Sequence, residues 1–210
     1  MASRSNQPAT KQEEDALIID FKLGSSLDKG VDVLDRVLFM VGEVTEELAA
    51  RVIVTLMALD SKPGPIRIVL NSCGGNEHEG FAIYDTIKSC QNPVEIYGLG
   101  QVFSIAALIM QAGTYRAMFS EAMFMAHNGE ITIEGGLRSD DVSKLARETK
   151  RSNDRYHELI ADRALLSVET IEDFCIKEKF FTAQEALDAG LIDEVVTRLP
   201  PLKISRGKNR

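Results

Sequence analysis

The sequence predicts an α/β protein with one domain built around a mainly parallel sheet. Short apolar runs of strand length alternate along the chain with segments in which apolar residues recur at helical spacing. Repeated strand–helix–strand units imply right-handed crossovers, which bring parallel strands into one sheet. A chain of 210 residues is long enough to bury roughly 70% of its unfolded surface in one core.

The first half of the chain contains the clearest strand signals. Three apolar runs, at residues 37–41, 65–71 and 94–98, end at or near glycines and have the length of buried strands. Thr45 and the two glutamates after it begin a helix between the first two runs. The apolar residues of this helix follow helical spacing: Leu48, Val52, Ile53, Leu56 and Leu59. A second helix, through Phe81–Ile87, precedes the third strand.

The second half begins with the apolar helix Ile105–Met110, whose lack of a polar face predicts burial. Two short strands are expected at Tyr115–Phe119 and Met123–Ala126, and a short capped helix at Thr182–Gly190. Between them, the charged segment from Arg138 to about Ala164 carries an apolar stripe at helical spacing: Val142, Leu145, Tyr156, Leu159 and Ile160. The stripe favours an oligomer contact, whereas the mixed charges alone are typical of a solvated face.

Composition sets the expected domain boundaries. Residues 1–34 are expected to be a flexible segment because polar residues surround a single short apolar island. Residues 198–210 are expected to be an exposed tail because Pro200 and Pro201 prevent a helix from continuing. The folded domain is therefore expected over residues 35–197.

Charge and cysteine content exclude several classes of function. A net charge of −8 argues against nucleic acid as a partner, and no apolar run approaches the roughly 18 residues of a membrane span. The three cysteines have no metal-ligand spacing, and an odd number without a secretory signal favours reduced thiols. We therefore expect a cytoplasmic protein without metal or cofactor.

Ser104 is the candidate nucleophile. It stands between a strand and the apolar helix that begins at Ile105. At a helix N-terminus the backbone donors and the positive end of the dipole favour a developing oxyanion. The alternative is a serine that only caps the helix.

His127 is the candidate general base. It follows the predicted strand Met123–Ala126, and a histidine is the usual base for a serine hydroxyl because its pKa lies near the working pH. Of the other two histidines, His78 lies in a polar turn and His157 in the charged segment. His127 is therefore preferred, although a lone histidine is more often structural.

A glycine pair supplies the candidate oxyanion hole. Gly74 and Gly75 end the second strand, and glycine lets a backbone N–H approach a ligand closely. We expect the N–H groups of Gly74 and Ile105 to bind the oxyanion. A glycine pair alone more often marks only a turn. The order of glycine pair, serine and histidine along the chain is a far more specific signal of a catalytic site than any one of them.

That order, and the sequence around it, resembles the Clp protease proteolytic subunit, a family of serine peptidases. The similar segments span the predicted domain from Asp35 to Val196: Asp35–Gly42, Val69–Gly75, Gly80–Thr86, Gly100–Ser104, Met125–His127 and Phe180–Asp193. The resemblance implies a crotonase-like spiral of strand–helix–strand units with a protruding handle helix. It also implies a homo-oligomer of heptameric rings, single or stacked, which encloses a chamber.

The resemblance further implies an ATP-dependent endopeptidase that hydrolyses unfolded polypeptides delivered by an AAA+ unfoldase. The family's third triad member is an aspartate, and its position falls on Phe174 here. Asp173 and Glu178 are the candidate substitutes. Glu178 is preferred because it would share a helix face with Phe174 if the helix continued, and Ser-His-Glu triads exist on other folds. The alternative is a Ser–His pair without an acid.

Other departures indicate a divergent member of the family, such as a phage or accessory form. Cys73 replaces the family's proline, Ile105-Ala106 replaces Met-Gly, and Asp173 replaces an arginine linked to contact between rings. Two rival functions share the core pattern: a non-catalytic ring subunit and a prohead-type maturation protease. A crotonase-like acyl-CoA enzyme shares the fold but does not require this Ser–His order.

Overall fold

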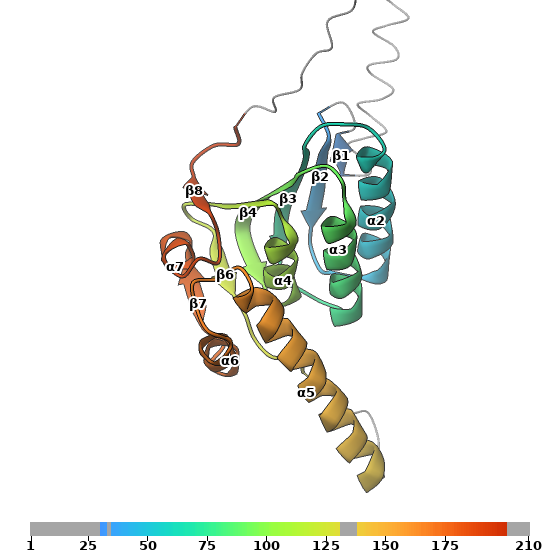
Figure 1. Cartoon of the computed structure of the whole chain (residues 1–210), viewed down its shortest axis with the longest axis vertical. Helices are drawn as coiled ribbons and strands as arrows, with labels where there is room; N and C mark the ends of the chain where they lie inside the picture. Colours follow the sequence, from blue (N-terminus) through green and yellow to red (C-terminus); the bar gives the residue numbers. More distant parts are fainter. Residues whose placement is uncertain (1–29, 33–34, 131–137, 201–210) are drawn as a thin grey trace, which may run out of the picture.

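The computed structural model describes residues 30–32, 35–130 and 138–200. The N-terminal segment and the C-terminal tail expected from the sequence lie outside these residues, except for 30–32 and 198–200. The predicted α/β class is confirmed, because helices surround a largely parallel sheet (Figure 1).

The sheet contains eight strands among the described residues. They are β1 Val31–Asp32, β2 Val37–Val41, β3 Ile66–Ser72, β4 Val94–Phe103, β5 Tyr115–Phe119, β6 Met123–Met125, β7 Phe180–Thr182 and β8 Glu194–Val196. Their order is β1-β2-β3-β4-β5-β8, and β6 pairs with both β4 and β7. The β1–β2 and β6–β7 pairs are antiparallel, and the others are parallel.

Strand β4 is longer than predicted and changes its partner along its length. Residues 95–98 pair with β5, whereas residues 101–103 pair with β6. The sequence prediction ended this strand at Gly98, two residues before Gly100. Gly100 has a φ of 62°, and a side chain there would approach Asn71 Oδ1 to 3.1 Å, so glycine lets the strand turn and continue. The sheet divides at this point, and Ser104 follows directly.

The described helices are α2 Glu46–Asp60, α3 Glu77–Ser89, α4 Ile105–Ala112, α5 Ser139–Ala161, α6 Val168–Ile176 and α7 Ala183–Asp188. Their caps follow the sequence. The Thr45 side chain accepts the N–H of Leu48 at the start of α2, and Thr182 with Glu185 forms the predicted capping box of α7. Helices α2, α3 and α4 lie in a row beside the sheet (Figure 1). All residues of α4 are buried, as predicted.

Helix α5 extends away from the rest of the domain (Figure 1). Tyr156 and Ile160, near its C-terminal end, are buried in the core, whereas Val142 and Leu145 are 43% and 37% exposed. The predicted apolar stripe is therefore divided, with one half packed in the domain and the other open to solvent. No described helix is long and apolar enough to cross a membrane.

The close packing of α3 on α4 at Gly80 gives a testable prediction. A Cβ at Gly80 would lie 2.0 Å from Ile105 Cγ1, so Gly80→Ala must push apart the two helices behind Ser104. Overpacking lowers the free energy of unfolding by about 1–3 kcal/mol. The higher helix propensity of alanine relative to glycine raises it by up to about 1 kcal/mol. We expect the free energy of unfolding, measured by urea denaturation, to fall by about 1–2 kcal/mol.

Ile105→Ala provides the matched control for this substitution. It removes the two closest clashing atoms, so Gly80→Ala should cost less in the Ile105→Ala background than in the wild type. Equal costs in the two backgrounds would contradict the packing argument.

Candidate active site

Ser104 occupies a strained turn between β4 and α4. Its φ of 57° and ψ of −127° are rare for a residue with a side chain, and such a conformation costs about 1–3 kcal/mol unless the surroundings impose it. Its N–H donates to the Met125 carbonyl at 2.9 Å. Its carbonyl accepts the N–H of Ala107 at 2.9 Å and the hydroxyl of Tyr156 at 2.8 Å. The backbone of Ser104 is thus fixed from three elements.

The Ser104 side chain meets His127. Ser104 Oγ lies 2.7 Å from His127 Nε2, and the hydroxyl makes no capping hydrogen bond to α4. The interpretation of Ser104 as a simple helix cap is therefore wrong. The two residues meet because β4 and β6 are parallel neighbours, with Phe103 opposite Met125, so both side chains leave the same end of the sheet.

The glycine turn after β3 packs directly against Ser104. Gly74 has a φ of 96°, and a Cβ there would lie 2.5 Å from the Ser104 Cβ. Its N–H donates to Ser72 Oγ at 3.1 Å, so this hydrogen is already engaged. Within the described part of the chain, the N–H of Gly75 enters no hydrogen bond. The N–H of Ile105, at the first position of α4, has no intrahelical acceptor. The sequence analysis chose Gly74 rather than Gly75 as the backbone donor. Two adjacent glycines give the same signal, so the sequence could not distinguish between their N–H groups.

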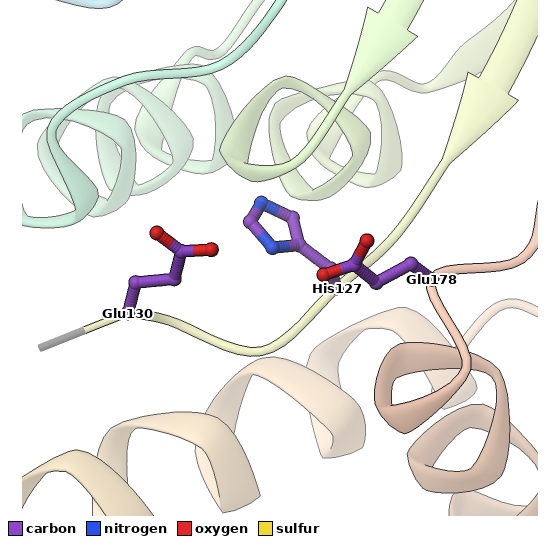
Figure 2. A group of neighbouring side chains, drawn as sticks. All are labelled: His127, Glu130 and Glu178. Carbon is purple, nitrogen blue, oxygen red and sulfur yellow. The ribbon is translucent and has the colours of Figure 1, made fainter.

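Glu178 lies near His127, but not through the continued helix considered in the sequence analysis. Helix α6 ends at Ile176, and Glu178 follows with a φ of 50°, so the condition under which Glu178 would share a helix face with Phe174 is not met. Glu178 and Glu130 each place a carboxylate oxygen within 4.8 Å of a His127 ring nitrogen. Both side chains lie beside the imidazole in Figure 2. Sequence reasoning missed Glu130, for which the only signal is its position three residues after His127.

The other acidic candidate is engaged elsewhere. Asp173 lies 2.7 Å from the ammonium group of Lys177. The ring of Phe174, at the position of the family's aspartate, packs against Phe181 with centroids 5.1 Å apart. Phe174 therefore contributes to the core beneath this part of the site.

The inner part of α5 supports both halves of the Ser–His pair. Tyr156 holds the Ser104 carbonyl, Asn153 Oδ1 accepts the N–H of Gly129 at 2.9 Å, and His157 Nε2 lies 2.8 Å from Asn128 Oδ1. Burial raises the pKa of Tyr156, with smaller contributions from Cys175 and Glu77, so its hydroxyl stays a donor. Neither Tyr156 nor His157 was recognised as part of the site, because helical spacing shows burial but not hydrogen-bond partners.

An open cleft of about 550 Å³ gives access to Ser104 and His127. Its acidic lining comes from Glu43, Glu77 and Glu130, and none of the described residues that line it is Lys or Arg. Cys73, which replaces the family's proline, is exposed at the same cleft. The site is therefore accessible and negatively charged.

The fold and the site define an α/β protein with a serine–histidine pair at a strand-to-helix turn. The Clp protease family model matches residues 26–199, and the chain belongs to this family. It is 31% identical over 183 residues to the ATP-dependent Clp protease proteolytic subunit 3 of Synechococcus sp. strain CC9902 and of Parasynechococcus marenigrum strain WH8102. Each match covers 83% of this chain and 91% of the relative.

Burial of His157 gives a prediction for the dependence of stability on pH. Burial lowers the pKa of His157 below its ordinary value of 6.5, partly offset by Glu172 and Asp154. The folded protein therefore resists protonation of His157. Its contribution to stability is complete above pH 6.5 and is lost as the pH falls below that value.

The measurement is the free energy of unfolding of wild type and His157→Gln between pH 5 and 8 (about the range over which histidine titrates). The difference between the two proteins should shrink as the pH falls. A difference that is constant with pH would show that His157 titrates normally in the folded state.

Proposed function

We propose that this chain is a serine endopeptidase subunit with Ser104 as nucleophile and His127 as general base. The observation that carries the proposal is the 2.7 Å contact between Ser104 Oγ and His127 Nε2. It is supported by the strained conformation of Ser104, since strain of this kind concentrates at functional sites. The family to which the chain belongs supports the same class of reaction.

The geometry supports the following reaction. Ser104 Oγ attacks the carbonyl carbon of a peptide bond while His127 Nε2 takes its proton, and the carbonyl oxygen becomes an oxyanion. His127 then passes the proton to the leaving amine as the C–N bond breaks. A water molecule, deprotonated by His127, releases the acyl group and restores Ser104.

We assign the oxyanion hole to the N–H groups of Ile105 and Gly75. Both are without a hydrogen bond acceptor in the described part of the chain, and both residues line the cleft at Ser104. The predicted donor Gly74 serves this role only if its N–H leaves Ser72 Oγ. Gly74 has a second role, because only a residue without Cβ fits against Ser104.

Glu178 is proposed as the group that orients His127. With Nε2 turned to Ser104, Nδ1 must carry the remaining proton for Nε2 to act as a base. A carboxylate near Nδ1 favours this tautomer and stabilises the imidazolium that forms. A carboxylate oxygen of Glu178 lies within 4.8 Å of a ring nitrogen of His127, and the residue is exposed. A small movement of its side chain would complete the hydrogen bond.

We propose that the chain acts on unfolded polypeptides as part of a cytoplasmic homo-oligomeric ring supplied by an AAA+ unfoldase. The curated relatives are called ATP-dependent proteolytic subunits. The exposed apolar residues Val142 and Leu145 on the free half of α5 provide a surface that another subunit would bury. Neither nucleic acid nor a membrane is expected as a partner.

Labelling with a fluorophosphonate tests the enzyme assignment. Wild type should be modified at Ser104 and should hydrolyse short peptide esters and unfolded proteins, whereas Ser104→Ala should do neither. His127→Ala should reduce the rates of labelling and of hydrolysis by at least roughly 10³-fold, because the serine hydroxyl loses its base. A folded wild-type protein that is not labelled at Ser104 would instead support a non-catalytic ring subunit.

Exchange of single carboxyl groups for amides tests the third member of the site. Glu178→Gln should lower kcat/KM by roughly 10- to 100-fold, less than the 10⁴-fold loss in a triad with a preformed hydrogen bond. Asp173→Asn is the matched control on the neighbouring helix and should leave kcat/KM unchanged, since Asp173 pairs with Lys177. Equal effects of the two variants would remove Glu178 from the mechanism.

A further inference from the structure

We propose that His127, Glu130 and Glu178 form a binding site for a divalent transition-metal ion such as Zn²⁺, and that the bound ion inhibits the Ser–His pair. The sequence predicted no metal site, because its candidate ligands come from two separate segments. Glu130 follows β6, and Glu178 lies between α6 and β7 (Figure 2). Only the fold brings them to the same imidazole.

The three residues provide suitable ligands at suitable separations. One ligand atom from each lies within 4.8 Å of the other two, and the set of one imidazole and two carboxylates suits Zn²⁺. Bonds of about 2.0–2.2 Å place tetrahedral ligands about 3.3 Å apart. Rotation of the Glu130 and Glu178 side chains can shorten the present separations to this value, because both residues are exposed.

One ring nitrogen of His127 remains free to bind a metal ion. Nε2 lies 2.7 Å from Ser104 Oγ, which leaves Nδ1 as the available ligand atom. In Figure 2 the ring lies between the two glutamates, with one nitrogen directed away from them. A metal ion at Nδ1 would therefore leave the Ser104 contact in place.

Among the described residues, no ion pair joins a Lys or Arg side chain to Glu130 or Glu178. Lys177 is paired with Asp173 at 2.7 Å, and the ammonium group of Lys179 lies 4.6 Å from the ring centroids of Phe174 and Phe181. The adjoining cleft adds Glu43 and Glu77, and its described lining includes no Lys or Arg. Two carboxylates this close repel each other, and a divalent cation between them removes the repulsion.

The consequence for catalysis follows from the proton on the imidazole, and this step rests on the proposed function. Neutral histidine carries one proton, which must be on Nδ1 for Nε2 to accept the proton of Ser104. A metal ion needs the lone pair of Nδ1, so the proton moves to Nε2 and no proton is lost. Nε2 then donates to Ser104 Oγ and cannot act as its base.

The binding test uses titration calorimetry with ZnCl₂ on the full chain carrying Ser104→Ala and Cys73→Ser. These changes remove the proposed nucleophile and the exposed thiol, which is a competing ligand. We expect a site whose affinity falls by more than roughly tenfold in Glu130→Gln and in Glu178→Gln. Glu121→Gln, an exposed glutamate in the turn before β6, is the matched control and should bind as tightly as the parent. If Zn²⁺ does not bind, or if Glu121→Gln loses as much affinity as the other two variants, the proposed metal site is wrong.

The inhibition test measures the rate of fluorophosphonate labelling at Ser104 in a chain carrying only Cys73→Ser. Zn²⁺ should slow labelling by more than roughly tenfold, and EDTA should restore it. Each variant is compared with its own rate without metal, and Glu130→Gln should need a higher Zn²⁺ concentration for the same inhibition. Labelling that is unaffected at saturating Zn²⁺ would overturn the inhibitory role. A protein that is never labelled would refute the proposed function, and calorimetry would still decide the metal site.

Discussion

The backbone conformation of Ser104 is the constraint on which the rest of the site depends. A positive φ at a serine is unfavourable by itself, so it persists only because β6, α4 and α5 each bind this residue. The turn directs the hydroxyl away from the start of α4 and toward His127. It also leaves the N–H of Ile105 open at the cleft. The direction of the Ser104 hydroxyl and the free N–H of Ile105, the proposed nucleophile and oxyanion donor, are therefore set by the same local geometry.

Helix α5 joins this geometry to a surface at the far end of the molecule. Its inner half carries Asn153, Tyr156 and His157, which bind the segments that present Ser104 and His127. Its outer half exposes Val142 and Leu145. One continuous helix therefore carries both the residues that contact the site and the residues that are open to solvent.

The sequence predicted the parts of the structure that depend on local pattern. The bounds of β2 and β5, the burial of α4 and the capping box of α7 follow from apolar runs and caps. The Ser104–His127 contact was predicted from their places at element ends. It could not be derived from spacing, because it depends on β4 exchanging β5 for β6 at Gly100. The hydrogen bonds of Gly74 and His157 could not be predicted from the sequence either, because periodicity indicates burial but not the partner of a polar atom.

The acid beside His127 does not come from Phe174, the residue at which the sequence resemblance places the family's aspartate. Phe174 packs against Phe181, so this residue contributes apolar contact at the helix end. The Glu178 carboxylate lies within 4.8 Å of a His127 ring nitrogen. Glu178 is one residue beyond the cap of α6 and has a φ of 50°. A longer side chain on exposed backbone loses more rotamer freedom when it is fixed. In the proposed role, Glu178 would therefore hold the imidazole less firmly than a buried aspartate. The same freedom would let its carboxylate turn toward a metal ion.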